Sequence, residues 1–455
     1  MGHLRTGLVL TFLAGVAALL LGGIGGGSRL AGVREDELNL FTRVLDVVRS
    51  DYLEPVDEHR LVLGAVRGLL AELDPDSAFL DRDAYAALRG DASGEVQALG
   101  IEISKRRDGS IEVVSPVDGT PAAKADIRAR DQIDSICPAD PTGEWSEECR
   151  SSESMTLFEA VRLLRGPKGS KVTIQVLRRG FDVPQPYTLV REVVKLRPVE
   201  GRMLEPRYPY VRIRAFREGT LEDLERALQQ LHEEADGSFE GLILDLRNNP
   251  GGLLEQAARV ADVWLTEGLV AYTEGRIEGQ RREFRAHAAG TEPSYPVTVL
   301  VNAGTAGSSE ILAGALKDHQ RALIVGTKTF GRGSVQTLYP LEGGGRLGLT
   351  TALYYTPSGR PIREVGITPD IAVGAVLAWE APKDPAAPRR ATPEPDLGED
   401  GLEGGRGGQS DVQLDRALEV LKSRSYFEGM KGGQKAGELQ ASAGEGASGV
   451  DQTPF

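Results

Sequence analysis

Side chains that could take part in acyl transfer are concentrated between Val301 and Gln336, in the segment VNAGTAGSSEILAGALKDHQRALIVGTKTFGRGSVQ. Covalent acyl transfer needs a hydroxyl or thiol that a neighbouring base activates. The first ten residues of the segment offer hydroxyls at Thr305, Ser308 and Ser309. A lysine can act as the base when burial lowers its pKa, whereas an arginine stays protonated. These rules decide what each position of the segment can do.

The segment resembles the active-site segment of the carboxyl-terminal processing peptidases, also called tail-specific proteases. Their motif reads approximately N-x-x-S-A-S-A-S-E-I, followed by G-x-K-T-F-G-K-G-S-V-Q. The shared S-E-I (309–311) and F-G (330–331) fix the alignment. The family's nucleophilic serine then falls on Gly307 and its basic lysine on Arg332. These positions are 25 residues apart, as the serine and lysine of the family are, so no gap shifts the register.

Neither replacement supports the family's chemistry. Gly307 has no side chain and cannot attack a carbonyl carbon. Arg332 keeps its proton and offers only donors, so it cannot act as the base. The resemblance implies that Gln336 is the glutamine that orients the catalytic lysine; here its candidate partner is Arg332. Ser308 is the fallback nucleophile if the loop were rotated by one residue, although we expect Ser308 and Ser309 to cap the helix that follows.

Strands and helices alternate from residue 205 to residue 378, which predicts an α/β core domain. The strand YVRIRAF leads into the helix TLEDLERALQQLHEEA, for which Thr220 is the expected N-cap. The buried strand GLILDLRNN runs into a Pro-Gly-Gly turn, and VTVLVN leads to Gly307. Sites in such sheets form at the carboxyl ends of the strands. The resemblance, which extends to TTALYYTPSGRPIREVGITPD (350–370), implies a core of the ClpP/crotonase-like type.

The motif LDLRNNPGG also matches the family. By resemblance, Gly251 or Gly252 and Ser308 would supply the backbone N–H groups of an oxyanion hole, because fixed amide donors stabilise the charge that develops on a carbonyl oxygen. The alternative is that the glycines only permit a tight strand-to-helix turn.

Residues 94–195 resemble a PDZ domain of the kind embedded in these peptidases. PDZ domains add an extended peptide to a sheet edge and bind its terminal carboxylate through backbone N–H groups. The resemblance implies that Ala98, Leu99, Gly100 and Ile101 form the carboxylate loop and that a groove helix spans 156–164. The family has glycine where this chain has Asp126 and Arg130, so we expect a local distortion without loss of the fold.

The N-terminus is predicted to be a signal or membrane anchor (1–30), because the apolar run 7–27 follows Arg5. An uncleaved inner-membrane anchor is slightly favoured over a cleaved signal, and both place the chain in the periplasm. Helices are expected over residues 35–92, where apolar residues recur at helical spacing. That region carries LDPDS (73–77), with Asp76 where the family usually has histidine, a position to which we assign a structural role.

The remaining features bound the alternatives. Cys137 and Cys149 bracket an acidic loop and form a disulfide in an oxidising compartment, or remain two buried thiols. The composition predicts a disordered linker (380–410), a helix (411–430) and a disordered tail (431–455). The net charge of −14 argues against nucleic acid as the main partner. No motif indicates a metal site or a cofactor.

The sequence therefore predicts an α+β multidomain protein of the cell envelope that binds extended or C-terminal peptide segments without hydrolysing them. Its candidate partners are polypeptide substrates or their C-terminal tails, an active peptidase relative, and the inner membrane. The alternative is an active serine endopeptidase that cleaves periplasmic proteins near their C-termini and uses Ser308. A purely structural envelope protein is a third hypothesis, which leaves the PDZ-like module and LDLRNNPGG unexplained.

Overall fold

The computed structural model describes residues 35–82, 85, 95–138, 149–195, 198–277, 281–374 and 411–423. The predicted anchor, linker and tail lie outside these ranges, as do residues 424–430 of the predicted C-terminal helix. The chain divides into two compact units, Met1–Leu69 and Leu70–Phe455.

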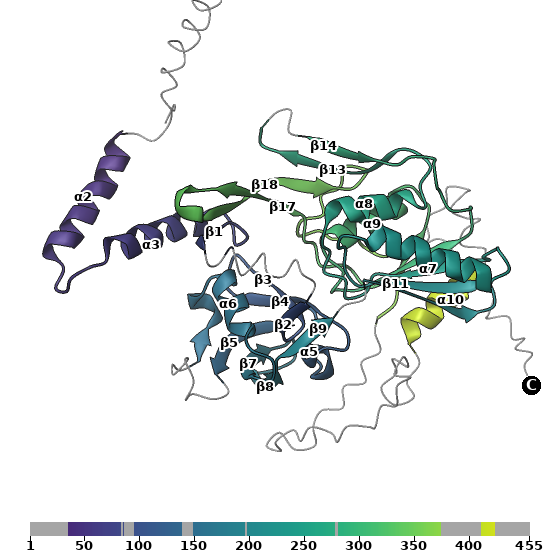
Figure 1. The fold of residues 1–455 in the computed structure, drawn as a ribbon, viewed down its shortest axis with the longest axis horizontal. Coiled ribbons are helices and arrows are strands. Elements are labelled where there is room, and N and C mark those ends of the chain that lie inside the picture. The colour runs from purple at the N-terminus through teal and green to yellow at the C-terminus, as the bar shows by residue number, and fades with distance from the viewer. Residues whose placement is uncertain are drawn as a thin grey trace, which may run out of the picture. The chain divides into compact units, whose positions relative to one another are not determined.

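Two helices begin the described part of the chain, α2 (Glu35–Asp51) and α3 (Glu58–Ala71) (Figure 1). They confirm the two helices expected from the spacing of apolar residues, but the predicted helical region (35–92) is wrong at residues 78–80, which form a strand. Much of the apolar face of α2 is exposed, including Leu38, Leu40, Phe41, Val44 and Val47. Within the described ranges, no helix combines the length and the apolar character that a membrane crossing requires; the apolar run 7–27 lies outside them.

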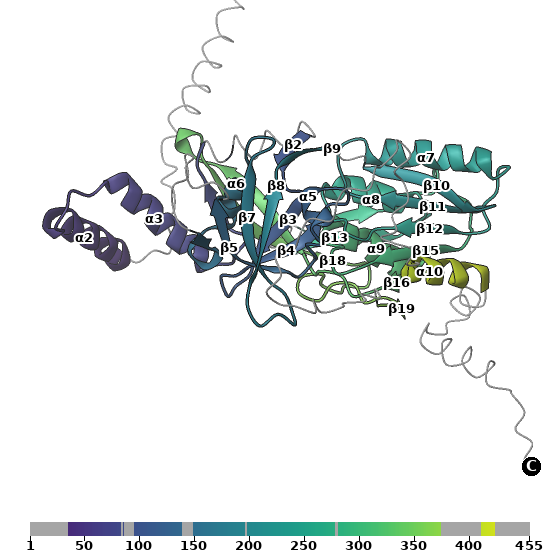
Figure 2. The same cartoon turned by 90° about the horizontal axis from the view of Figure 1, so that it is seen from below.

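The PDZ-like module contains one main sheet in the strand order β3-β4-β5-β7-β8, with β6 paired to β5. Its strands are β3 (Ile101–Lys105), β4 (Ile111–Pro116), β5 (Gln132–Pro138), β6 (Arg150–Ser151), β7 (Lys171–Leu177) and β8 (Gln185–Val190). A separate ladder joins β2 (Glu95–Ala98) to β9 (Glu192–Lys195), and the helices are α5 (Pro121–Lys124), a 3₁₀ turn (Ser152–Ser154) and α6 (Leu157–Leu164). Because β3 is the terminal strand of its sheet, one of its edges is unpaired among the described strands (Figure 2).

The groove helix α6 confirms the span expected from the sequence. Its N-cap is Thr156, whose hydroxyl accepts from the N–H of Glu159 at 3.2 Å. The carboxylate of Glu159 accepts from the N–H of Thr156 at 2.7 Å. This reciprocal pair is a capping box, which satisfies two N–H groups that the first turn would otherwise leave unpaired.

The two residues that replace glycine adopt the backbone that glycine favours. Asp126 has a φ of 64° and Arg130 a φ of 74°. Arg178 supports the turn between them, since its Nη2 donates to the carbonyl of Asp126 and to Oδ2 of Asp131, both at 2.6 Å. The fold of the module is retained, as expected.

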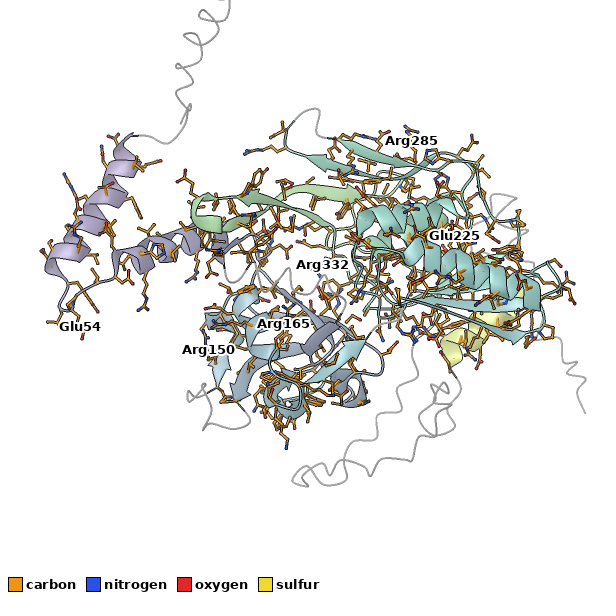
Figure 3. All side chains as sticks on the ribbon, viewed as in Figure 1. Glu54, Arg150, Arg165, Glu225, Arg285 and Arg332 are labelled. Carbon is orange, nitrogen blue, oxygen red and sulfur yellow. A yellow bond between two sulfur atoms is a disulfide. The ribbon has the colours of Figure 1, made fainter. Side chains whose placement is uncertain are left out.

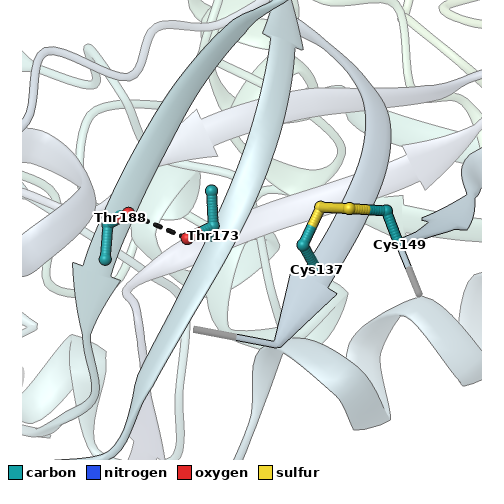
Figure 4. The surroundings of a disulfide bond; sticks show 4 residues. All are labelled: Cys137, Cys149, Thr173 and Thr188. Atoms are coloured by element: carbon teal, nitrogen blue, oxygen red, sulfur yellow. Dashed lines mark hydrogen bonds between the residues drawn. A yellow bond between two sulfur atoms is a disulfide. The ribbon is translucent and has the colours of Figure 1, made fainter. Parts of the chain in front are cut away.

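Cys137 on β5 is bonded to Cys149, which precedes β6 (Figure 4). Their Cα atoms are 4.1 Å apart. The structure thus favours the disulfide over the two free thiols, and the bridge closes a segment whose residues 139–148 lie outside the described ranges. On the neighbouring β7–β8 ladder, the hydroxyls of Thr173 and Thr188 share a hydrogen bond of 2.8 Å (Figure 4).

The core domain is built on a sheet in the order β10-β11-β12-β15-β16-β19. β10 is antiparallel to β11, and the following pairs are parallel. The strands are β10 (Val199–Glu205), β11 (Tyr208–Ile213), β12 (Leu242–Asp245), β15 (Val297–Val301), β16 (Leu323–Gly326) and β19 (Ile371–Ala372). The helices are α7 (Thr220–Glu234), α8 (Leu254–Asp262), α9 (Ser308–Asp318) and α10 (Val412–Ser423). This arrangement confirms the predicted α/β core.

Alternate residues of these strands face opposite sides of the sheet, as strand geometry requires. On β12, Leu242 and Leu244 pack with α7, α8 and α9, whereas Ile243 packs with α10. Figure 1 shows α7 and α10 on opposite sides of the strands near β11, and Figure 2 shows the strands of this sheet side by side. Both faces are covered, which explains why the strands read as continuous apolar runs.

A second sheet has the order β1-β18-β13-β14, with β17 paired to β18. Its strands are β1 (Ala78–Leu80), β13 (Leu269–Gly275), β14 (Arg282–Arg285), β17 (Ser334–Pro340) and β18 (Arg346–Tyr355), with a 3₁₀ turn at Glu342–Gly344. Because β1 pairs with β18, the LDPDS segment that precedes β1 is fastened to the sheet that contains β17. Asp74 accepts a hydrogen bond from the hydroxyl of Thr350 at 3.0 Å.

One predicted cap is wrong. The N-cap of α7 is Gly219, with a φ of 83°, and Thr220 is the first helical residue. The hydroxyl of Thr220 instead accepts from the N–H of Arg217 at 2.9 Å. Glycine at this position takes a left-handed backbone without strain, so the chain enters the helix one residue earlier than the side-chain preference suggests.

Candidate active site

Gly307 lies in the sharp turn between β15 and α9, at the carboxyl end of a central parallel strand. Its φ is 59° and its ψ is −122°, a conformation that side-chain-bearing residues adopt only with strain. β12 neighbours β15, so the β12–α8 turn (246–253) reaches the same edge. The N–H of Ala306 donates to the carbonyl of Asn249 at 2.9 Å. The two turns are therefore joined at the sheet edge where the sequence predicts a site.

The hydroxyls next to Gly307 all donate to carbonyls of the β12–α8 turn. These bonds run from Ser308 to Gly252 (3.3 Å), from Ser309 to Asn249 (3.1 Å) and from Thr305 to Leu246 (2.8 Å). All three hydroxyl side chains are buried. The prediction that Ser308 and Ser309 cap the helix is wrong, because they act as donors that fasten its start to the neighbouring turn. The fallback nucleophile Ser308 has no base within hydrogen-bond distance among the described residues.

The candidate N–H donors of the oxyanion hole differ in whether they already donate a hydrogen bond within the protein. The N–H of Gly251 donates to Oδ1 of Asn249 at 2.9 Å. In the described part of the chain, the N–H groups of Gly252 and Ser308 have no acceptor. A Cβ on Gly252 would lie 2.1 Å from the carbonyl oxygen of Phe216, so the turn also requires glycine for steric reasons. Gly252 and Ser308 remain as the donors that could contact a carbonyl oxygen.

Arg332 lies between β16 and β17, in the core domain (Figure 3). Its Nη1 donates to Oε1 of Glu102 on β3 at 2.9 Å, and its side chain is 31% exposed. Burial disfavours the charged guanidinium, but Glu102, Asp76 and Glu310 outweigh that effect and raise the pKa of Arg332. The position that holds the base in the family is therefore occupied by a permanent cation.

Glu310 joins the two replaced positions. Its carboxylate accepts from the N–H of Gly307 and from the N–H of Arg332, both at 2.9 Å. It also accepts from the N–H of Gly331 at 2.7 Å and from the hydroxyl of Thr329 at 2.5 Å. Burial raises the pKa of Glu310 to about 7, and these four hydrogen bonds lower it in part. We missed this role in the sequence, although an acid among the apolar residues of SSEILAGAL was the available signal.

Asp76 and Gln336 contact this region in ways that the sequence did not reveal. Oδ2 of Asp76 accepts from the hydroxyl of Ser334 at 2.9 Å, and its charge helps to raise the pKa of Arg332. The side-chain amide of Gln336 donates to the hydroxyl of Thr350 at 2.6 Å. Among the hydrogen bonds of the described residues, none joins Gln336 to Arg332, the partner suggested by the sequence.

The predicted carboxylate loop lies between β2 and β3. Ala98 ends β2, Ile101 begins β3, and Gly100 between them has a φ of 76°. Leu99 is buried in the core of the module. The loop thus leads directly into the strand with an unpaired edge, as strand addition of a peptide requires.

Chemically, the arrangement retains donors for a carbonyl oxygen but has neither a nucleophile nor a neutral base at the family positions. Within the described ranges, no group of three or more His, Cys, Asp or Glu side chains is placed to hold a metal ion.

Comparison with known proteins is consistent with this architecture. Residues 207–373 match the profile of peptidase family S41, residues 91–177 that of the PDZ domain, and residues 27–84 that of the activating protease CtpB N-terminal domain.

Full-length relatives cover most of the chain. It is 41% identical over 338 residues to a carboxy-terminal-processing protease of Bartonella bacilliformis, which covers 74% of this chain and 75% of the relative. It is 37% identical to a carboxyl-terminal-processing protease of Synechocystis, over 71% of this chain and 74% of that protein. The solved photosystem II D1 C-terminal processing protease is 30% identical, with a TM-score of 0.62 over 75% of this chain and 94% of that one. The chain therefore belongs to the carboxy-terminal processing proteases of peptidase family S41, with a PDZ domain.

Proposed function

We propose that this chain is a non-hydrolysing member of its family that binds extended or C-terminal peptide segments. The proposal depends on the residues at the two positions where the family has its nucleophile and its base. Gly307 offers no nucleophile, and Arg332 is a cation paired with Glu102. The hydroxyls that could substitute for the nucleophile are buried and donate to backbone carbonyls. Acyl transfer fails when both functions are lost.

Peptide binding does not depend on the lost groups. The unpaired edge of β3, the preceding loop 98–101 and the groove helix α6 supply the parts that a PDZ domain uses for a C-terminal segment. Ile101, Leu157 and Val161 are partly buried apolar side chains packed against the core of the module. The occupant would be a polypeptide with a free C-terminal carboxylate, which the chain sequesters or presents to an active relative.

We further propose that the protein acts outside the cytoplasm, at the inner membrane. The apolar run 7–27 after Arg5 supports this location. The disulfide between Cys137 and Cys149 supports it independently, because such bonds persist in oxidising compartments.

The test of catalysis compares the natural chain with Gly307→Ser, Arg332→Lys in a peptide-hydrolysis assay and with a serine-directed fluorophosphonate probe. A Cβ at Gly307 would lie 3.4 Å from the carbonyl oxygen of Pro250, so a serine has space there, at the cost of backbone strain from the positive φ of 59°. We expect neither turnover nor labelling of the natural chain. Turnover together with labelling at Ser308 would instead establish the displaced-nucleophile enzyme.

The Gly307→Ser, Arg332→Lys variant should have low hydrolytic activity unless a negative charge near position 332 is also removed. Glu102, Asp76 and Glu310 favour a cation at position 332, so they would keep an introduced lysine protonated. Adding Asp76→Asn removes one of these charges. We expect the triple variant to be more active than the double variant at neutral pH, because a general base must be unprotonated.

The test of binding uses fluorescence anisotropy with one peptide in two forms, a free C-terminal acid and the C-terminal amide. We expect the acid to bind at least about tenfold more tightly, since charged hydrogen bonds contribute roughly 1.5–3 kcal/mol. Equal affinities would show that the carboxylate loop does not select C-termini.

A further inference from the structure

The PDZ module and the core domain contact each other through polar side chains at several points. The contacts pair Glu102 with Arg332, Arg130 with Phe330, Ser115 with Asn248, Asp118 with Arg212, and Arg107 with Glu364. Two of the core residues, Phe330 and Arg332, belong to the FGRG segment (330–333) that carries the base position. Two of these five contacts therefore lie at the segment that carries the family's base position.

The first contact to this segment is the ion pair of Arg332. Its partner Glu102 lies on β3, and their 2.9 Å separation is that of a charge-assisted hydrogen bond. The backbone N–H of Arg332 donates a hydrogen bond to the buried carboxylate of Glu310. This bond fixes the backbone from which the arginine side chain extends. A lysine offers one compact charge, whereas the longer guanidinium reaches with several donors.

The second contact uses Arg130. Its Nη2 donates to the carbonyl of Phe330 at 2.5 Å, and its guanidinium lies 4.0 Å from the centroid of the Phe330 ring. Its Nη1 pairs with Glu112 at 3.3 Å. Arg130 stands where the family pattern has glycine, and it takes a φ of 74°. An arginine at a glycine position incurs backbone strain, which these contacts offset.

We infer that Arg332 and Arg130 form an arginine tether that keeps the PDZ module closed against the FGRG segment of the core. This goes beyond peptide binding, because it assigns the former base position a mechanical role. The strand that presents its free edge for a peptide, β3, is the strand that carries Glu102. Both ion-pair side chains are partly exposed, at 31% and 45%, so salt should weaken the tether.

The experiment measures the distance between the two domains by electron–electron double resonance. Spin labels are placed on Arg162→Cys in α6 and Glu225→Cys in α7, both exposed positions, and the native disulfide leaves these as the free thiols. We expect one narrow distance distribution in the parent. Arg332→Gln and Arg130→Gln should each raise the population of open arrangements roughly two- to fivefold, the range for partly exposed pairs.

The double variant Arg332→Gln, Glu102→Gln should broaden the distribution no more than Arg332→Gln alone, because both changes remove the same ion pair. Arg282→Gln is the matched control, since Arg282 pairs with Glu255 within the core at 2.7 Å. Raising the salt concentration should broaden the distance distribution of the parent protein more than that of the Arg332→Gln variant, which has already lost the ion pair. If Arg332→Gln and Arg130→Gln kept the parental distribution, or if the effects of Arg332→Gln and Glu102→Gln simply added, the tether would be disproved. Hydrolysis and peptide affinity are measured separately, so this outcome is independent of the proposed function.

Discussion

Glu310 shows how one buried side chain can stabilise the two loops that carry Gly307 and Arg332. Its oxygens accept four hydrogen bonds, one from the first loop and three from the second. An acid that is fully buried loses its hydration, and these donors replace it. Glu310 therefore holds the turn through the backbone N–H of Gly307. This bond does not require a side chain at position 307.

At the residue scale, we predict a pH-dependent stability that Glu310→Gln removes. The pKa of Glu310 is raised from 4.5 to about 7 in the folded chain. The folded state thus binds a proton more tightly than the unfolded state, so this stabilisation is full below about pH 4.5 and is lost as the pH rises through 7. The shift corresponds to about 3 kcal/mol.

Urea unfolding at a series of pH values from 4.5 to 8 measures this effect. The natural chain should lose more free energy of unfolding over this range than Glu310→Gln, which should be less stable overall because an amide cannot accept all four bonds. Glu225→Gln, an exposed change on α7, should keep the natural slope. Identical slopes for all three proteins would refute the assignment.

At the scale of elements, the β12–α8 turn is fixed by backbone contact with the segment after β11. The N–H of Phe216 donates to the carbonyl of Gly251 at 2.9 Å, and the N–H of Leu253 donates to the carbonyl of Phe216 at 2.7 Å. Gly252 lies between these bonds with a φ of 132°. Only a residue without a side chain lets the two backbones approach this closely.

We predict that Gly252→Ala lowers the free energy of unfolding by about 3–5 kcal/mol, from steric overlap and backbone strain together. Gly237→Ala is the matched control, because Gly237 also has a positive φ, of 83°, but no atom within 4 Å of an added Cβ. It should cost only about 1–2 kcal/mol. Equal losses in chemical denaturation would mean that close packing does not restrict Gly252.

At the scale of the whole molecule, α10 covers one face of the core sheet, whose strands lie much earlier in the chain. Ala417, Val420 and Leu421 pack on the face of the sheet opposite α7, α8 and α9. Arg247 links this helix to the sheet, since it pairs with the buried Asp245 and with Asp411. Burial opposes the charge of Asp245, yet Arg247 and Arg212 outweigh it and lower its pKa.

We predict that a chain ending at residue 410 is strongly destabilised or aggregates, whereas one ending at residue 430 is not. Burial of Val420 and Leu421 alone contributes about 3–6 kcal/mol, and the shorter chain exposes apolar residues such as Ile243 and Leu300. Thermal unfolding and light scattering of both proteins test this. Similar melting temperatures would show that α10 contributes little.

Much of this architecture could be predicted from local patterns. Helical spacing predicted α2 and α3, and the resemblance to PDZ domains placed the groove helix at 156–164, where α6 lies. The glycine at the start of α7 was missed because a threonine next to it is the commoner cap. The direction of the Ser308 and Ser309 hydroxyls could not be predicted, because it depends on carbonyls in a turn more than 50 residues away.

The sequence by itself determined the family and the residue types, Gly307 and Arg332, at the positions where the family has its nucleophile and its base. A missing side chain and a guanidinium that cannot release its proton are properties of residue type, which no fold changes. Only the tertiary structure decided what took their place. Glu102, Asp76 and Glu310 are distant from Arg332 in the chain. Folding brings their carboxylates near its guanidinium, and burial there weakens the screening by water, so their charges raise its pKa.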